Sequence, residues 1–427
     1  MAETTPAGYT PLGEASLPAW LAGLPAVADR LGGGPSDWQV REVGDGNLNL
    51  VFLVDGPAGR CCVKQALPYV RLVGPEWPLP LERTFFEHEC LRDHGAHAAR
   101  LVPEVWHYDP AMFAIVMEQL APHVIMRRGM IDGVVYPRFA DDIAEYCATT
   151  LFYCSDLYLT AAEKKARMAV FCGNTELCKI TEDLIFTDPY RTHELNRWTS
   201  PQLDEAKATF ERDDELKLAV SRLKVRFMGS AEALIHGDLH TGSIMVTPED
   251  TRVIDPEFAF WGPRGFDLGA VVGNLLLNYL AQDGHEAAGR PSAAPRDAYR
   301  RWVLETIERF WTGFDARFLA LWRTEARGDA YPQALFADPA GQAALERERE
   351  RFVAELWRDT LGFGAAKMIR RILGLAHNID LEWIEDPDMR ARCERRCLAL
   401  ARTMMTEPER YPTVADLLAA AGAARAP

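Results

Sequence analysis

Residues 232–269 read EALIHGDLHTGSIMVTPEDTRVIDPEFAFWGPRGFDLG, and this stretch decides the fold that we expect. Two short apolar runs, 233–235 and 253–254, have the composition of β-strands. Asp238 follows the first run, and Asp255 and Glu257 follow the second. Buried carboxylates repel one another and raise each other's pKa, so acids gathered in this way favour a site for a divalent cation.

A plainer interpretation is that each of these acids caps a strand or a turn. For one acid alone that alternative is as good as the functional one. It is a poor account of three acids at this spacing, with Gly237 and Gly242 loosening the backbone around the first. We therefore interpret the stretch as a metal-dependent catalytic core, with a strand at 243–246 followed by a turn at 247–251.

The stretch resembles the catalytic core of protein-kinase-like small-molecule kinases, which include choline kinases and aminoglycoside phosphotransferases. Protein kinases carry H-R-D-L-x-x-x-N and then D-F-G. Asp238 matches the catalytic Asp, and Asp255 the magnesium-binding Asp. Ser243 stands where that pattern has Asn, and Glu257 where it has Gly. The motif HGDLHTGSI, followed by DPEFAFWGPRGFD, resembles the 5-methylthioribose kinase family, whose members have Ser and Glu at these two positions.

The amino-acid composition limits the classes of binding partner and the cellular compartment that we expect. The 427 residues are 48% hydrophobic, enough for two domains, and the net charge of −15 argues against a nucleic-acid or anionic-membrane binder. The nine cysteines form no C-x-x-C pair, and we interpret them as reduced, mostly buried thiols of a cytoplasmic protein. The sequence shows no signal peptide, and its most apolar later segment, 268–281, is too short to span a membrane.

A glycine-containing hairpin is predicted near the N-terminus, after a helical extension at 16–31. Residues 38–43 and 51–54 alternate like strands around the turn GDGNLN, residues 44–49. Such a hairpin covers ATP phosphates in kinases, although Asp-Gly turns are also common in ordinary hairpins. The turn is similar to that of the methylthioribose kinases, and the resemblance makes Asn49 a candidate nucleotide contact.

Lys64 lies on the next predicted strand, 60–65, and it is the only lysine in the first 163 residues of an arginine-rich chain. A retained lysine indicates a position that a planar guanidinium cannot fill, such as a compact cation between two phosphates. The alternative is a surface lysine at a strand end. A helix predicted over 79–94 offers Glu87 and Glu89 as ion-pair partners for Lys64, and alignment by eye to the family favours Glu87.

The first domain is predicted to end near residue 120. Strands at 101–105 and 114–117 lead to Glu118, Gln119 and Leu120, where a kinase hinge presents its backbone to adenine. We assign residues 1–120 to an N-terminal lobe and 121–427 to a C-terminal lobe. In the second lobe we predict helices at 141–159, 174–183, 201–227, 302–322 and 344–361, with a loop at 282–296.

Two adjacent arginines, Arg370 and Arg371, interrupt the apolar segment FGAAKMIRRILGLAH, residues 363–377. Guanidiniums on a packed helix need partners. From the residues alone, one buried ion pair and one exposed arginine would explain them. In methylthioribose kinases an arginine pair at this motif reaches the sugar, so the resemblance makes both residues candidate substrate ligands.

The predicted fold class is α+β, a two-lobed protein-kinase-like fold with a small antiparallel sheet and a large helical lobe. The resemblance runs from Tyr9 nearly to the C-terminus. It implies an S-methyl-5-thioribose kinase of methionine salvage that uses ATP and Mg²⁺, phosphorylates the anomeric 1-hydroxyl and forms a homodimer. In that assignment Asp238 is the catalytic base and contacts the substrate, and Asp255 and Glu257 bind the metal.

Two alternatives remain at this point. The first is a kinase of the same fold that acts on choline, an aminoglycoside or homoserine. A choline site calls for an aromatic cage and an aminoglycoside site for acidic residues, and an arginine pair suits neither cation. The second is a nucleotide-binding pseudokinase, against which the intact Lys64, Asp238 and Asp255 argue.

Overall fold

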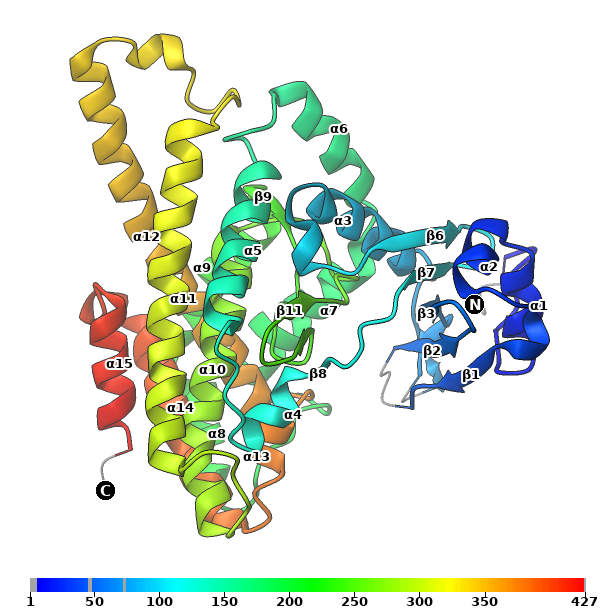
Figure 1. The fold of residues 1–427 in the computed structure, drawn as a ribbon. Helices are drawn as coiled ribbons and strands as arrows, with labels where there is room; N and C mark the ends of the chain where they lie inside the picture. The colour runs from blue at the N-terminus through cyan, green and yellow to red at the C-terminus, as the bar shows by residue number, and fades with distance from the viewer. Residues whose placement is uncertain (1–5, 45–47, 72–73, 426–427) are drawn as a thin grey trace. The chain divides into compact units, whose positions relative to one another are not determined.

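The structure is a computed structural model, and it describes residues 6–44, 48–71 and 74–425 (Figure 1). The chain divides into two compact units. The first unit contains Met1–His123, Asn174–Leu177 and Arg252–Ala259, and the second contains the rest. Two short segments that come later in the sequence than residue 123 therefore belong to the first unit, and one of them carries Asp255 and Glu257.

The first unit is built on an antiparallel sheet of five strands in the order β1-β2-β3-β7-β6. Its elements are α1 Leu17–Ala22, α2 Pro25–Leu31, β1 Gln39–Glu42, β2 Asn49–Asp55, β3 Arg60–Ala66, β4 Tyr69–Val70, β5 Gly74–Pro78, α3 Arg83–Ala98, β6 Val105–Asp109 and β7 Ala114–Glu118. Strand β3 lies in the centre of the sheet, where its backbone pairs with β2 on one side and with β7 on the other. Alternate residues of β2 and β3 pack against α1 and α2 in an apolar core that includes Phe52, Val54 and Val63.

The second unit is mainly helical. Its helices are α4 Met126–Ile131, α5 Phe139–Tyr153, α6 Ala161–Phe171, α7 Thr175–Phe186, α8 Asp204–Arg212, α9 Asp214–Gly229, α10 Arg264–Ala287, α11 Arg296–Thr324, α12 Pro339–Leu373, α13 Ile379–Glu382, α14 Pro387–Thr406 and α15 Val414–Ala423. The first three residues of α7 fall in the first unit. The short strands are β8 Val124–Ile125, β9 Ala233–Ile235, β10 Ile244–Val246, β11 Thr251–Val253 and β12 Phe260–Gly262, and the last two residues of β11 fall in the first unit. Strand β9 pairs with β12, and β10 pairs with β8.

The sequence predictions differ from the structure mainly at boundaries. The predicted strand at 101–105 is wrong, because Ala99–Leu101 is a 3₁₀ turn and β6 begins only at Val105. The predicted helix 201–227 is two helices, because the Asp213 side chain accepts from the Leu216 N–H and caps a new one. The predicted loop at 282–296 starts too early, since α10 runs to Ala287. Helix α12 is continuous over 35 residues, where we predicted a helix ending at residue 361.

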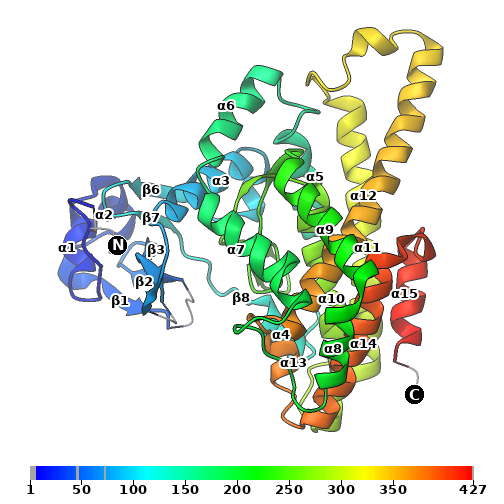
Figure 2. The same ribbon diagram turned by 180° about the vertical axis from the view of Figure 1, so that it is seen from behind.

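Helices α10 and α12 approach each other closely at three glycines. A Cβ on Gly269 would lie 2.5 Å from the Gly364 nitrogen, and one on Gly273 would lie 2.7 Å from the Gly364 oxygen. The close approach lets the backbones of α10 and α12 touch without intervening side chains. Helices α10, α12 and α14 lie side by side in both views (Figures 1 and 2).

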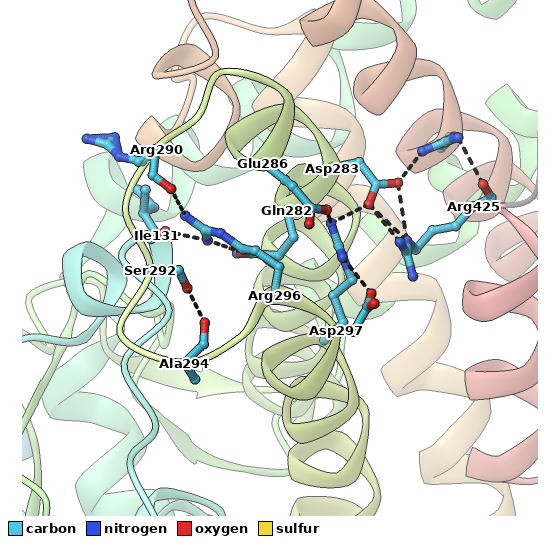
Figure 3. Close-up of polar contacts among 12 residues, drawn as sticks. Ile131, Gln282, Asp283, Glu286, Arg290, Ser292, Ala294, Arg296, Asp297 and Arg425 are labelled. Carbon is cyan, nitrogen blue, oxygen red and sulfur yellow. Dashed lines mark hydrogen bonds and ion pairs between the residues drawn. The ribbon is translucent and has the colours of Figure 1, made fainter.

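A single carboxylate, Asp283 on α10, joins four parts of the second unit (Figure 3). It accepts from Arg300 of α11 at 2.8 Å, from Arg396 of α14 at 2.7 Å and from Arg425 after α15 at 2.8 Å. Arg425 also bonds in a fork, because its Nε lies 3.2 Å from the same carboxylate. The network fixes the end of the described chain to the helical core.

The cysteine prediction is confirmed as far as it concerns pairing and burial. All nine cysteines are free thiols, and six of them are buried. Within residues 6–44, 48–71 and 74–425, every helix is too short or too polar to cross a bilayer.

The glycine contact between α10 and α12 gives a stability prediction. Gly269→Ala should lower the free energy of unfolding by about 1–3 kcal/mol, because the new methyl meets backbone atoms that cannot rotate away. Urea unfolding followed by circular dichroism measures the change. Gly422→Ala in α15 is the control, since nothing lies within 4 Å of its added Cβ. The control should be neutral or more stable by up to about 1 kcal/mol. Equal effects of the two substitutions would contradict the close-packing account.

Candidate active site

Lys64 is the centre of a charged cluster in the first unit. It lies on β3 opposite Val51 of β2 and Ile115 of β7, and it is only 7% exposed. Its Nζ lies 2.7 Å from the Glu87 carboxylate and also contacts Asp255. Burial opposes the charge of the ammonium, but the Asp255 and Glu87 carboxylates outweigh burial and raise the pKa of Lys64. Lys64 is therefore a fixed, fully charged cation.

The structure brings Glu87, and not Glu89, to Lys64. Both residues lie on α3, but Glu89 pairs with Arg92 at 2.6 Å and with His88 at 3.2 Å. Burial raises the pKa of Glu87 to about 8, although Lys64 acts in the opposite direction. The nearby Asp255 and Glu257 carboxylates add to the effect of burial on the Glu87 pKa.

Three carboxylates, Glu87, Asp255 and Glu257, offer oxygen atoms that all lie within 4.8 Å of one another. Burial also raises the pKa of Glu257, because the desolvation of its carboxylate outweighs the attraction of the Lys64 ammonium. Oxygen ligands and surplus negative charge are what Mg²⁺ requires, so the donor set fits a hard divalent cation. Asp255 has a φ of 70°, a conformation that non-glycine residues rarely adopt and that clusters at functional sites.

Neutral and cationic side chains hold the loop that carries Asp255 and Glu257. The Asn49 amide donates to Glu257 at 2.9 Å, and Arg83 donates to the Asn49 oxygen from two nitrogens, at 3.1 and 2.8 Å. Arg83 is fully buried and lies 3.5 Å from Glu257. The Asn174 amide donates to the carbonyl oxygens of Glu257 and Ala259, at 3.0 and 2.9 Å. These contacts fix the position of Glu257 before any ligand binds.

In the second unit, Asp267 of α10 shapes the loop that carries Asp238. Its two carboxylate oxygens accept from the backbone N–H groups of His236 at 2.7 Å and Gly237 at 3.0 Å. Gly237 has a φ of 84°, where a side chain would be strained. The left-handed glycine and the anchored amides turn the chain sharply after β9 and place Asp238 on the loop beyond it.

The Asp238 carboxylate has cationic surroundings. Lys367 of α12 donates to its Oδ1 at 2.9 Å, and His240 Nε2 lies 3.3 Å from its Oδ2. Burial alone would raise the pKa of Asp238, but Lys367, His240, Arg370 and Arg371 together hold it well below its usual range. Asp238 is consequently ionised at neutral pH.

The two predicted arginines lie near the C-terminal end of α12. Arg371 is 7% exposed, and its Nη1 donates to the Ala376 carbonyl oxygen at 3.1 Å. Arg370 Nε is buried and has no hydrogen-bond partner among the described residues. Burial lowers the pKa of both guanidiniums, and for Arg371 the neighbouring Arg370 adds to that effect. A buried donor without a partner is a group that a polar ligand could satisfy.

A third arginine, Arg127 of α4, joins the loop that carries Asp238 to the helical core. It donates to Thr241 at 3.0 Å and to Asn274 at 3.1 Å, and lies 3.6 Å from Asp380. Arg127 also adds positive potential near Arg371, whose pKa it lowers. The polar groups around Asp238 therefore carry a surplus of positive charge.

Comparison with known proteins decides the family. The family model described as "Phosphotransferase enzyme family" matches residues 39–310. Methylthioribose kinase 1 of Oryza sativa subsp. japonica is 46% identical over 414 residues, covering 96% of this chain and 95% of the relative. Methylthioribose kinase of Escherichia coli O45:K1 is 43% identical over 422 residues, covering 99% of both chains. The chain belongs to the methylthioribose kinase family. The predicted family and fold class are confirmed.

The other residues predicted from the resemblance to methylthioribose kinases lie in the first unit. Asn49 is 4% exposed and contacts Glu257, so its amide is already engaged with a candidate metal ligand. The turn centre at 45–47 lies outside the described residues. Glu118 ends β7, and its carboxylate accepts from Arg252 at 3.2 Å and from the Glu104 N–H at 3.2 Å. Gln119 and Leu120 follow it and are partly buried.

Sequence reasoning missed three cations: Arg83, Arg127 and Lys367. Nothing in their neighbourhoods in the sequence distinguishes the two arginines in an arginine-rich chain. Lys367 carried the same signal as Lys64, because it is the only lysine among residues 225–427. The rarity of lysine in this half of the chain would therefore have singled out Lys367.

Replacing Lys64 by arginine tests whether a compact ammonium is required in this member of the methylthioribose kinase family. Lys64→Arg should reduce kcat/KM for ATP-dependent transfer by about 100-fold, because a planar guanidinium cannot take the position of the compact ammonium between two phosphates. Coupled ADP release measures the rate, and thermal unfolding checks the fold. Lys165→Arg on the exposed face of α6 is the matched control and should keep full activity. Wild-type kcat/KM in Lys64→Arg would contradict the phosphate-binding role.

Proposed function

We propose that this chain transfers the γ-phosphoryl group of ATP to the anomeric 1-hydroxyl of S-methyl-5-thioribose, giving S-methyl-5-thioribose 1-phosphate. The observation that carries the proposal is the 43–46% identity, over nearly the whole chain, to proteins named methylthioribose kinase. The charged cluster around Lys64 offers groups for binding the nucleotide, and the cluster around Asp238 offers groups for binding the acceptor. Methionine salvage is the pathway that the family name implies.

The first unit supplies the groups for the nucleotide. Lys64 would contact the α- and β-phosphates, with Glu87 holding its ammonium in place. Asp255 and Glu257 would hold Mg²⁺, which neutralises charge on the phosphates when it is bound. Glu118, Gln119 and Leu120 follow the sheet where a hinge would present its backbone to adenine. Asn49 would act on the nucleotide through Glu257, which it holds at 2.9 Å.

The second unit supplies the groups for the acceptor. Asp238 would orient the 1-hydroxyl and take its proton as the new O–P bond forms and the bond to the ADP oxygen breaks. A carboxylate with a low pKa is a weak base, so its main contribution is orientation, with proton transfer late in the reaction. An anomeric hydroxyl suits such a base, because it is more acidic than an ordinary alcohol. Arg370 and Arg371 would bind sugar oxygens or the transferring phosphoryl group.

The charge around Asp238 separates the proposed acceptor from the cationic alternatives. Lys367, Arg370 and Arg371 lower the pKa of the carboxylate, which means that their positive field acts where an acceptor hydroxyl would bind. Choline or an aminoglycoside would carry further positive charge into that field. A pseudokinase is disfavoured because Lys64, Asp238 and Asp255 are all retained and two of them form an ion pair. We also propose that the protein is cytoplasmic and forms a homodimer. Each protomer would have an N-terminal lobe, residues 1–120, and a C-terminal lobe, residues 121–427.

An acceptor panel tests the function. Purified protein with Mg-ATP should release ADP fastest with methylthioribose, and far more slowly with choline, kanamycin or homoserine. Asp238→Asn is the matched control: it should lose turnover, because an amide cannot take the proton, while ATP affinity measured by calorimetry stays near wild type. Faster turnover of another acceptor would overturn the substrate assignment. A large loss of ATP affinity in Asp238→Asn would contradict its assigned role.

Metal binding gives a separate prediction. With a non-hydrolysable ATP analogue present, saturating Mg²⁺ at about 100 times its Kd should stabilise the protein by about 2.7 kcal/mol relative to EDTA. Differential scanning fluorimetry measures the corresponding rise in Tm. Glu257→Gln should lose most of the rise, because one anionic ligand is removed. Glu89→Gln should keep it, since Glu89 pairs with Arg92 outside the cluster. A full Mg²⁺ response in Glu257→Gln would exclude Glu257 as a ligand.

A further inference from the structure

Lys367 is a buried lysine for which the roles proposed above have no use. It lies on α12 and is 2% exposed. Its Nζ donates to Asp238 Oδ1 at 2.9 Å and lies 4.3 Å from the centre of the Phe266 ring. A buried ammonium is costly unless it is paired, so the pair with Asp238 is what allows a lysine at this position.

The packing of α10 against α12 sets the position of Lys367. Gly364, one turn earlier on α12, contacts the α10 backbone at Gly269 and Gly273. The same stretch of α10 begins with Phe266, under the Lys367 ammonium, and Asp267, which anchors the loop of Asp238. One helix pair therefore fixes both the loop that carries the carboxylate and the cation that contacts it.

His240 holds the other oxygen of the same carboxylate. Its Nδ1 accepts from the Gly242 N–H at 3.0 Å, so Nδ1 carries no proton. In the neutral ring the proton is then on Nε2, which lies 3.3 Å from Asp238 Oδ2. With Lys367 at Oδ1 and His240 at Oδ2, the carboxylate has a defined rotation, and each oxygen keeps lone pairs for an acceptor hydroxyl.

We propose that Lys367 is a positioning residue for Asp238: its charge keeps the carboxylate ionised, and its hydrogen bond fixes which oxygen faces the acceptor. The proposal rests on the role of Asp238 in the proposed function. It does not depend on which acceptor is used, because Lys367 acts on the base and not on the sugar.

The ionisable groups around Lys367 agree with this role. Asp238 and His240 face it from the catalytic loop, Asp267 from α10, and Arg370 and Arg371 from its own helix. Burial lowers the pKa of Lys367 to about 8; Asp238 opposes this effect, and Arg370 adds to it. Lys367 is thus mostly protonated at neutral pH and loses its proton as the pH rises through about 8. Loss of its charge removes a factor that keeps the pKa of Asp238 low.

The test compares pH profiles of kcat/KM for three variants with whichever acceptor the wild type uses best. Lys367→Met removes the charge and the donor, Lys367→Gln keeps a donor, and Lys367→Arg keeps the charge. In Lys367→Met and Lys367→Gln the acidic limb should move to higher pH by about 1–3 units, because a carboxylate without its cation protonates more easily. In Lys367→Arg the acidic limb should stay near that of the wild type. Lys367→Met should also lower kcat by about 10- to 100-fold with KM for ATP unchanged.

Arg347→Gln, on an exposed turn of the same helix, is the matched control and should leave the profile and kcat unchanged. An acidic limb that stays in place in both Lys367→Met and Lys367→Gln would overturn the electrostatic part of the proposal. If Lys367→Met does not fold, Lys367→Gln and Lys367→Arg still decide that point, since they differ in charge while both keep a donor. If another acceptor replaces methylthioribose in the panel, the substrate assignment fails, but the shift in the acidic limb remains decisive for Lys367.

Discussion

The first unit depends on one buried ion cluster, in which the Lys64 ammonium faces Glu87, Asp255 and Glu257. Two of these carboxylates, Glu87 and Glu257, are buried, and their pKa values are raised, mainly by burial and further by the neighbouring acids. Burying charge of one sign is unfavourable unless another ion compensates it. A divalent cation would supply that compensation, which explains why Arg83 and Asn49 are arranged to hold Glu257 and not to neutralise the whole cluster.

The second unit has the opposite imbalance. Asp238 is one carboxylate among Lys367, Arg370 and Arg371, and its pKa is depressed. An excess of positive charge beside an ionised base suits a reaction in which a neutral sugar hydroxyl receives a phosphoryl group. The glycine contact between α10 and α12 is the packing feature on which this arrangement depends, because it brings Lys367 and the anchored loop of Asp238 to the same place.

Much of this arrangement could be predicted from local sequence. Asp238, Asp255 and Glu257 stood out because each follows a short apolar strand, and Lys64 because lysine is rare in this chain. The choice between Glu87 and Glu89 could not be made from periodicity, since both lie on one helix two residues apart. The family resemblance favoured Glu87, and the packing of α3 brings that residue to Lys64. The strand at 101–105 was wrong because an apolar run fits a 3₁₀ turn as well as a strand.

The remaining features depend on contacts between distant parts of the chain. Lys367 and Asp238 are 129 residues apart, and no local pattern pairs them. Arg83 is distinctive only through its bonds to Asn49 and its approach to Glu257. The continuity of α12 was obscured by glycines at 362 and 364, which would weaken an isolated helix but here allow α10 to approach.

The most direct measurement is a crystal structure with Mg²⁺, a non-hydrolysable ATP analogue and methylthioribose bound together. The account predicts a metal ion ligated by Asp255 and Glu257, phosphate oxygens on Lys64, and the sugar 1-hydroxyl within about 3.2 Å of the Asp238 carboxylate. A metal ion without those two ligands, or a 1-hydroxyl out of reach of Asp238, would contradict it.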